Sequence, residues 1–267
     1  MLYYKQFIHS ESKEWIVLIH GAGGSSAVWH KQLRDFQKDF NLLLIDLRGH
    51  GKSTDLAQKI WKQEYTFEAV TADIIEVLDH LQIPPAHFMG VSLGTILARQ
   101  LAEMQPQRVK SLVMAGAVTR LTFQSRVLVV LGNATKRIIP YMWLYKLFAF
   151  IIMPRKQHAE SRNLFIREAQ KLCQKEFIRW FKLTKDINPL LRYFKEKELP
   201  IPTLYIMGDQ DVMFLEPVKY LVKKHKNSFL EILERCGHVV NVEQPEKFNT
   251  LSLAFIKNQT NSIFAIQ

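Results

Sequence analysis

The sequence predicts an α/β protein built on a mostly parallel β-sheet flanked by helices. Short continuous apolar runs recur along the chain, which is typical of strands buried on both faces. Helical patterns, such as the one at residues 67–81, separate these runs, and strands that alternate with helices favour a parallel sheet. At 267 residues and 48% hydrophobic content, the chain can bury a sizeable core as one domain, or as one domain with an insertion.

Six buried strands and one edge strand are expected. Residues 3–8, which a polar segment at 9–13 joins to the next strand, are expected to add an antiparallel edge strand. The carboxyl ends of parallel strands converge on one edge of a sheet, so functional residues are expected in the loops that follow the strands. The buried strands are expected at residues 15–20, 41–46, 86–91, 109–115, 202–207 and 228–233.

The most informative motif is Gly-Val-Ser-Leu-Gly at residues 90–94. An apolar run ends just before it and a segment that can open a helix follows, so the motif predicts a strand, a sharp turn and a helix with Ser92 at the apex. Such a turn strains the backbone so that the hydroxyl projects freely, and Gly90 and Gly94 let strand and helix approach without a Cβ clash. Ser92 is therefore the candidate nucleophile.

A glycine-rich turn supplies candidate backbone donors. His-Gly-Ala-Gly-Gly at residues 20–24 follows the expected strand at 15–20 and exposes amide N–H groups. The N–H groups of Ala22 and Leu93 are candidates to hold the negative oxygen of a tetrahedral intermediate. The alternative is an ordinary glycine-rich loop between a strand and a helix.

Two further loops carry an acid and a base. Asp209 and Asp211 follow the expected strand at 202–207, and His238 lies in a Cys-Gly-His loop after the last expected strand. An acid at a strand end can orient a histidine, and a base in the later loop can reach across the sheet to the serine. The chain order Ser92, Asp211, His238 is the order of the α/β-hydrolase arrangement.

On these motifs the chain resembles α/β-hydrolase-fold serine hydrolases of the esterase and lipase type, over nearly its whole length. The resemblance implies that Ser92 is the nucleophile, His238 the general base and then acid, and Asp211 its orienting group, with the Ala22 and Leu93 amides as the oxyanion hole. Asp209 is the second choice for the acid. The motifs that carry the resemblance are residues 20–24, Asp-Leu-Arg-Gly-His-Gly-Lys-Ser at 46–53, residues 90–94, 208–211 and 237–238.

The resemblance also implies an inserted helical cap that sets substrate choice. Residues 120–190 are expected to form this cap, and residues 1–119 and 191–267 the two parts of the core. Trp29, Trp143 and Phe148 are the candidates for substrate binding, with core packing as the alternative for Trp29. The expected reaction is acyl transfer through a serine ester, followed by hydrolysis, on a lipophilic ester or thioester. It requires no metal and no cofactor.

The charge of the chain is concentrated in the expected cap. Between residues 120 and 190 there are fourteen lysines and arginines against four acidic residues, within a formal net charge of +11 for the whole chain. Large apolar residues are interleaved with them, which predicts helices with one apolar and one basic face. A solvated outer face explains the charges simply. The sharper hypothesis is contact with an anionic membrane surface or with an anionic acyl substrate such as a phospholipid or coenzyme A ester. Nucleic acid is not expected as a partner, because no nucleic-acid motif accompanies the charge.

Other polar residues are expected to be structural. Asp46, Arg48 and His50 lie in a loop with turn glycines, His225 is expected at a solvated helix position, and Cys236 is expected to be a small buried thiol. The chain has two cysteines, an N-terminus without the features of a signal peptide, and a longest apolar stretch that is too short to span a bilayer. These features predict a cytoplasmic protein, with peripheral membrane attachment as the alternative.

Three rival functions stay open. The same triad serves a lyase of the menaquinone-synthase type, although the Gly-Tyr-Ser-Met-Gly-Gly-Arg turn usual there is absent from this sequence. A triad-bearing chain of this fold can also act as a ligand sensor with very slow turnover. The third is an interfacial binding protein whose basic cap anchors it to membranes. A serine at the apex argues against dehalogenases and epoxide hydrolases, which need an aspartate there.

Overall fold

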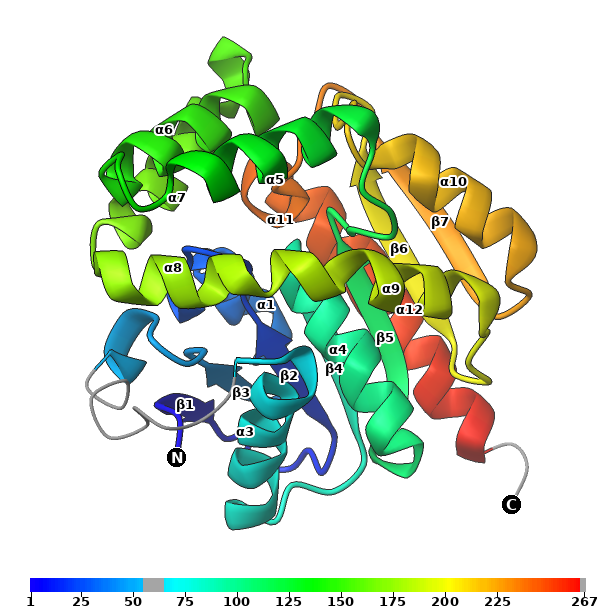
Figure 1. Ribbon diagram of the computed structural model, residues 1–267. Coiled ribbons are helices and arrows are strands. Elements are labelled where there is room, and N and C mark those ends of the chain that lie inside the picture. Colours follow the sequence, from blue (N-terminus) through cyan, green and yellow to red (C-terminus); the bar gives the residue numbers. More distant parts are fainter. Residues whose placement is uncertain (55–64, 265–267) are drawn as a thin grey trace.

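The computed structural model describes residues 1–54 and 65–264. Seven strands form one sheet with the order β1-β3-β2-β4-β5-β6-β7 (Figure 1). Strand β1 is antiparallel to β3 and the other neighbours are parallel. The predicted edge strand and five of the six predicted buried strands are confirmed, with small shifts at their ends. The sixth, at residues 228–233, is a strand as predicted, but it lies at the second edge of the sheet and is therefore largely exposed rather than buried. The strands are β1 Tyr4–Phe7, β2 Trp15–Ile19, β3 Asn41–Ile45, β4 Ala86–Val91, β5 Val109–Ala115, β6 Thr203–Gly208 and β7 Ser228–Leu233.

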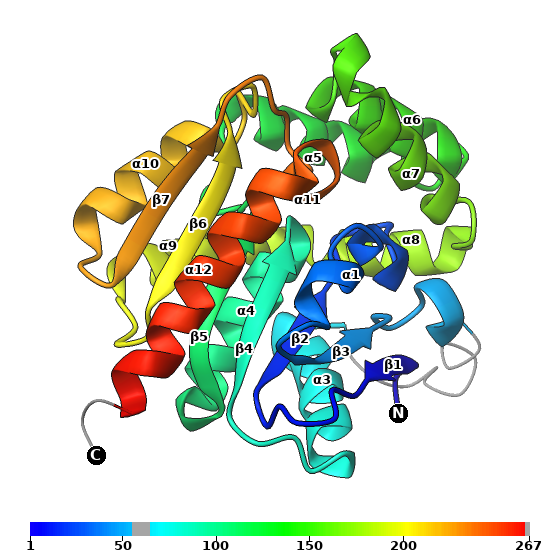
Figure 2. The ribbon, with the colours of Figure 1, turned by 180° about the vertical axis from the view of Figure 1, so that it is seen from behind.

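Helices cover both faces of the sheet, as predicted for an α/β protein. Figure 1 shows α3 (Phe67–His80), α4 (Leu93–Met104) and α10 (Leu215–Lys224) in front of the sheet. Figure 2 shows α1 (Leu33–Phe36) and α12 (Pro245–Phe264) on the opposite face. The short helix α11 is Val240–Glu243, and single 3₁₀ turns occur at Ser26–Trp29, Gly51–Ser53, Pro106–Arg108 and Lys156–His158.

The position of strand β2 between β3 and β4 explains why its sequence is apolar throughout. Ile16 and Leu18 belong to the core cluster on the α12 side. Val17 and Ile19 belong to the cluster on the α3 and α4 side. Successive side chains of a strand point to opposite faces, so a central strand covered on both sides needs apolar residues at every position.

Five helices between β5 and β6 lie over the carboxyl ends of the strands (Figure 1). We call residues 123–196 the helical insertion. The expected cap boundary at residue 190 falls inside its last helix, because the second half of that helix packs Leu191 and Phe194 into the main core. The helices are α5 Phe123–Thr135, α6 Tyr141–Ile152, α7 Ala159–Ala169, α8 Gln174–Lys182 and α9 Thr184–Glu196.

Candidate active site

Ser92 lies at the sharp turn between β4 and α4. Its backbone has φ 53° and ψ −118°, a region that residues with side chains rarely adopt. The two flanking glycines make the turn possible by close packing. A Cβ on Gly90 would lie 2.5 Å from the backbone of Gly94, and a Cβ on Gly94 would lie 2.3 Å from the carbonyl oxygen of Ile19. The predicted geometry of strand, turn and helix is therefore confirmed.

The structure brings Ser92, His238 and Asp211 into one hydrogen-bonded chain. The Ser92 hydroxyl lies 2.9 Å from Nε2 of His238, and Nδ1 of His238 lies 2.7 Å from Oδ2 of Asp211. An ionised carboxylate can only accept, so Nδ1–H donates to Asp211 and Nε2 is left to accept the serine proton. His238 and Asp211 are buried.

The surroundings of His238 favour its protonated form. Burial by itself lowers the pKa of an imidazole, but the charge and hydrogen bond of Asp211, together with the charge of Glu243, raise the pKa of His238 above its usual 6.5. A base with this pKa can take a proton from a hydroxyl near neutral pH and hold the resulting positive charge.

The second acid of the loop has a different partner. Asp209 accepts a hydrogen bond from the backbone N–H of Cys236 at 3.0 Å through Oδ1. This bond ties the β6 loop to the loop that carries His238. Cys236 is buried as predicted, and burial with the neighbouring acids raises the pKa of its thiol far above the usual range, so it is a poor nucleophile.

The glycine-rich loop lies directly against the serine turn. A Cβ on Gly21 would lie 3.1 Å from Cβ of Ser92 and 3.8 Å from the amide nitrogen of Leu93. Ala22 and Leu93 both border the same cavity as Ser92. Among the described residues, neither of their amides donates a hydrogen bond, and Leu93 is the first residue of α4. A helix N-terminus with free amides is a favourable place for a negative oxygen.

Two neutral histidines hold the glycine-rich loop in place. Nε2 of His50 accepts the N–H of Gly23 at 3.0 Å, and Nε2 of His20 accepts the N–H of Leu47 at 2.9 Å. Their Nδ1 atoms then donate to backbone carbonyls. Burial lowers the pKa of both imidazoles, that of His50 to about 3 with a further contribution from His20.

The segment at residues 46–53 connects this loop to the helical insertion. Asp46 accepts the N–H of Ser26 at 2.7 Å and that of Lys52 at 2.9 Å. Trp180 of α8 donates from its indole to the carbonyl of Arg48 at 2.9 Å. Asp46 therefore holds neighbouring backbone in place, whereas Arg48 pairs with Asp73 of α3 at 2.6 Å, and both residues lie outside the triad.

A cavity of about 290 Å³ opens beside Ser92, under the helical insertion. Its walls are almost entirely apolar, and Phe148 is among them, whereas lysine and arginine are absent from the described lining residues. Glu168 is the carboxylate in this lining; it accepts the Ser25 hydroxyl at 2.6 Å and pairs with Lys171 at 2.7 Å. The apolar lining comes from both the core and the insertion and includes Phe67, Leu121, Leu128, Tyr145, Phe148, Ala149, Leu164, Phe177, Trp180, Phe214 and Val239.

Three sequence predictions about single residues were wrong. Trp29 is fully buried against Phe248 of α12, so it is core and does not line the cavity. Trp143 is 72% exposed, because it lies on the outer side of α6, away from the cavity. His225 is buried at the end of α10, where its ring donates to the carbonyl of Lys195 at 3.0 Å, and is not solvated.

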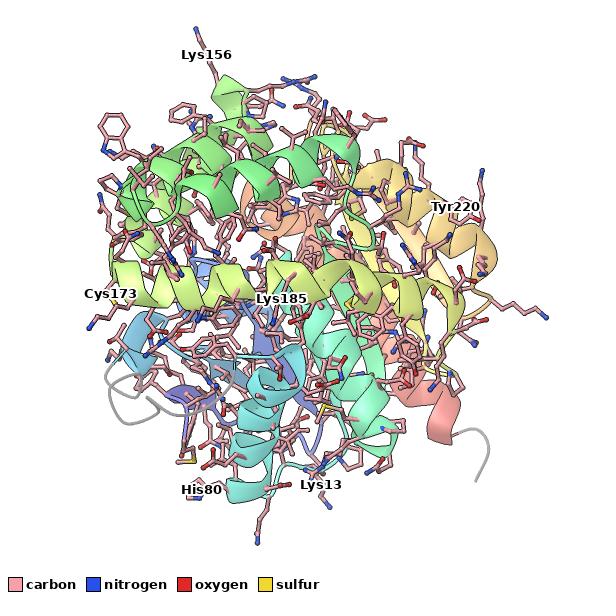
Figure 3. All side chains as sticks on the ribbon, in the orientation of Figure 1. Lys13, His80, Lys156, Cys173, Lys185 and Tyr220 are labelled. Atoms are coloured by element: carbon pink, nitrogen blue, oxygen red, sulfur yellow. The ribbon has the colours of Figure 1, made fainter. Side chains whose placement is uncertain are left out.

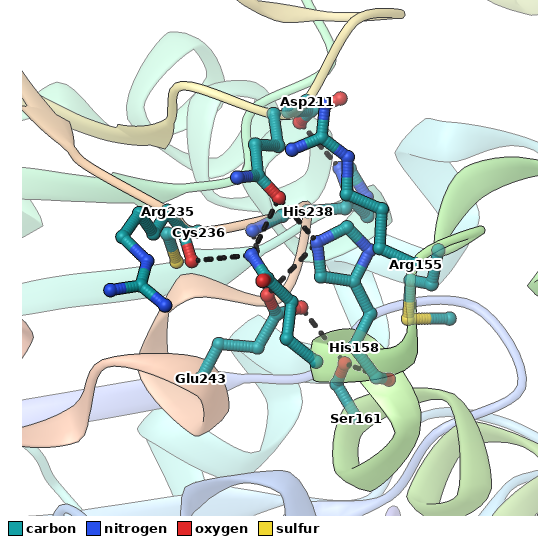
Figure 4. A network of polar contacts seen from close by, with 12 residues as sticks. Arg155, His158, Ser161, Asp211, Arg235, Cys236, His238 and Glu243 are labelled. Carbon is teal, nitrogen blue, oxygen red and sulfur yellow. Dashed lines mark hydrogen bonds and ion pairs between the residues drawn. The ribbon is translucent and has the colours of Figure 1, made fainter.

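Sequence reasoning missed Glu243, which links the His238 loop to the insertion (Figure 4). Its Oε2 accepts the N–H of Gly237 at 2.6 Å, and its Oε1 accepts the hydroxyl of Ser161 at 2.8 Å. Buried His158 lies 3.8 Å from the same carboxylate and 3.1 Å from Oε1 of Gln210. The sequence shows Glu243 only as an acid at a helix start, where acids are common.

Comparison with known proteins agrees with this architecture. The family model of the alpha/beta hydrolase fold matches residues 14–140. The 3-oxoadipate enol-lactonase 2 of Acinetobacter baylyi is 27% identical over 255 residues, covering 91% of this chain and 88% of that protein. A Bacillus subtilis protein named for 2-succinyl-6-hydroxy-2,4-cyclohexadiene-1-carboxylate synthase is 27% identical, covering 92% of this chain and 91% of that one. The crystal structure of a hydrolase from Pseudomonas aeruginosa superposes with a TM-score of 0.79 at 24% identity, covering 95% of this chain and 93% of that one. The fold class and the family resemblance predicted from the sequence are confirmed.

Proposed function

We propose that the chain, which resembles proteins of the α/β-hydrolase fold, is a serine hydrolase that cleaves a carboxylic ester with a neutral, lipophilic acyl group. The observation that carries the proposal is the hydrogen-bonded chain Ser92–His238–Asp211 at the wall of an apolar cavity. The similarity to a 3-oxoadipate enol-lactonase supports the reaction class. Thioesters share the same chemistry and are included in the proposal.

The mechanism follows from the hydrogen bonds. His238 takes the proton of the Ser92 hydroxyl through Nε2 as the oxygen attacks the carbonyl carbon. The amides of Ala22 and Leu93 hold the oxygen that becomes negative. His238 then gives its proton to the departing alcohol or thiol, and water repeats the sequence on the serine ester. Asp211 fixes the tautomer and stabilises the imidazolium.

The cavity lining favours an uncharged acyl group. Apolar walls are favourable for a hydrocarbon chain, with about 0.8 kcal/mol for each methylene group that they bury. A carboxylate on the acyl group would need a cationic partner, and the described lining offers none.

The same argument weakens the lyase alternative. The Bacillus subtilis relative is named for a product that carries a carboxylate and a succinyl group. The described walls of this cavity lack the lysine or arginine that would pair with such groups. We therefore place the ester hydrolase first and keep the lyase as the second candidate, because its relative aligns with most of this chain.

The test is hydrolysis of nitrophenyl esters from acetyl to palmitoyl by the parent protein and three variants. Ser92→Ala should abolish turnover, and Asp211→Asn should lower kcat by roughly 10⁴-fold, as an orienting carboxylate does in other triads. Asp209→Asn is the matched control and should keep most of the activity, because its contact is with the Cys236 amide.

The acyl-length profile tests the substrate class. A maximum at a medium or long chain supports a lipophilic substrate. Equal background rates in the parent and Ser92→Ala would overturn the hydrolase proposal and favour the lyase or a ligand-binding role. A profile that falls steadily from acetyl onward would contradict the lipophilic acyl group alone.

A further inference from the structure

Helix α5 presents an apolar stripe to solvent. Phe123, Val127, Val130 and Leu131 are all exposed, Phe123 to 81%. Their spacing of i, i+4, i+7 and i+8 places them on one side of a helix. On a surface helix of a globular protein this stripe normally faces the core, so its exposure here requires an explanation.

Helix α6 repeats the pattern. Trp143, Leu147, Phe150 and Ile151 have the same spacing and are exposed. Exposed Ile138 lies in the connection between the two helices. We call this surface, formed by the exposed apolar residues of 123–151, the α5–α6 face. It holds nine of the seventeen large hydrophobic residues that are exposed in the described part of the chain. Clustering of this kind marks an interaction surface, whereas scattered exposed residues do not.

The opposite sides of the same helices are also apolar. Leu128 and Val129 of α5, and Phe148 and Ile152 of α6, line the cavity beside Ser92. The two helices therefore form a single layer over the cavity, with apolar residues on both its inner and its outer surface. Helices that are apolar all round are otherwise found inside large proteins or in contact with lipid.

The charged residues within the α5–α6 face are all basic. The sequence contains no acidic residue between Glu103 and Glu160. Arg126, Arg137 and Lys146 are exposed on or between the two helices, and in the described residues none of them is in an ion pair with a carboxylate. Figure 3 shows Lys156 projecting into solvent at the far tip of the insertion.

From these observations we propose that the α5–α6 face docks on a lipid bilayer that contains anionic lipids. The apolar stripes enter the boundary between headgroups and acyl chains, and the basic residues contact the negative headgroups. The helices lie in the plane of the membrane surface, because within residues 1–54 and 65–264 no helix has the length and apolar content to cross it. A globular protein partner would bury the apolar stripes equally well, but the uniform positive charge favours an anionic surface. The proposal does not depend on the hydrolase activity.

Vesicle flotation with the purified full chain tests this proposal. Vesicles of phosphatidylcholine alone are compared with vesicles that also contain phosphatidylglycerol, at low and at physiological salt. The parent protein should float with the anionic vesicles at least tenfold more strongly than with the neutral ones, and less at high salt. Ser92→Ala should bind equally, so loss of catalysis and loss of docking are separate results.

Three pairs of surface substitutions, one of them a control, locate the contact. Phe123→Ser with Trp143→Ser should reduce binding at least tenfold, because it removes one large apolar side chain from each stripe. Both side chains are exposed, so their removal leaves the core intact. Ile8→Ser with Tyr220→Ser is the matched control, since these residues are exposed to 66% and 58% elsewhere on the molecule, and should bind like the parent. Arg137→Glu with Lys146→Glu should remove the preference for anionic vesicles. Circular dichroism verifies folding of every variant.

Several outcomes would overturn the proposal. Equal binding to neutral and anionic vesicles, or no binding to either, would exclude an anionic bilayer as the partner. Dimerisation of the parent in analytical ultracentrifugation, lost in the Phe123 and Trp143 variant without any vesicle binding, would assign the face to a second copy of the chain. Release from vesicles by millimolar glycerol phosphate would indicate recognition of a free phosphate rather than of the bilayer.

Discussion

The contact of Glu243 with the loop that carries His238 leads to a specific prediction for kcat/KM and its pH dependence. Glu243→Gln keeps the shape of the side chain, its amide oxygen can still accept the Gly237 N–H, and its amide nitrogen can donate to Ser161. Only the charge is lost. Glu243→Ala removes both hydrogen bonds and leaves the buried donor of Gly237 without a partner. Glu246→Gln is the matched control, because Glu246 is exposed on the adjacent α12.

The magnitudes follow from the contacts. A hydrogen bond to a charged group contributes about 1.5–3 kcal/mol and a neutral one about 0.5–1.5 kcal/mol, so Glu243→Gln should cost about 1 kcal/mol. If this cost of about 1 kcal/mol acts on the transition state through a less well positioned His238, kcat/KM falls about fivefold. Glu243→Ala leaves a buried donor unpaired at about 1–3 kcal/mol and frees the loop. A displacement of a reacting group by about 1 Å can cost about 10²-fold in rate, so kcat/KM should fall about 10- to 100-fold.

The pH profile separates positioning of His238 from a general loss of stability. The charge of Glu243 contributes to raising the pKa of His238. The base must be neutral to act, so activity rises with pH through this pKa, above 6.5 in the parent. Removing the charge lowers the pKa, and the acid limb of kcat/KM against pH should move to lower pH in Glu243→Gln but stay in place in Glu246→Gln. Folded Glu243 variants with the parent's acid limb and kcat/KM within twofold of the parent would refute the reasoning.

Two further predictions concern the cavity and the buried histidines. Ala149 is fully buried and lines the cavity, so Ala149→Leu should shift the ester profile to shorter chains, with about fourfold lower kcat/KM for each methylene excluded. Exposed Ala254→Leu is its control, and an unchanged profile would contradict the assignment of the acyl site. His50 has a folded-state pKa of about 3 against 6.5 unfolded, so the unfolded chain binds more protons and stability falls as pH drops from about 6.5 towards 3, by at most about 1.4 kcal/mol per pH unit. Urea unfolding at pH 7, 6 and 5 should show a shallower loss in His50→Gln than in the parent; equal slopes would count against a neutral buried His50.

The sheet and the hydrogen-bonded chain were predictable because their signals are local. Apolar runs of strand length mark the strands, and parallel strands deliver the loops that follow them to one edge of the sheet. Gly90 and Gly94 identify the turn around Ser92, since only residues without a Cβ fit there. Asp211 could be ranked above Asp209 only through the family resemblance, and the structure shows the contact with His238 directly.

The interior and exterior of the helical insertion could not be read from the sequence. Helix α6 is apolar nearly all round, so its pattern does not tell which side faces the cavity, and the prediction for Trp143 failed for this reason. Trp29 follows the glycine-rich loop, but its 3₁₀ turn directs the side chain towards Phe248, a residue more than 200 positions away in the chain.

The sequence by itself therefore determined the α/β class, the positions of the strands along the chain and the turn that carries Ser92, because each depends on backbone geometry that a few neighbouring residues dictate. The choice of Asp211 over Asp209 needed the family resemblance in addition. Only the tertiary structure decided how Glu243 joins the His238 loop to the insertion, which aromatic residues line the cavity, and that the α5–α6 face is open to solvent. These features depend on contacts between segments far apart in the chain, and no local pattern of residues signals such contacts.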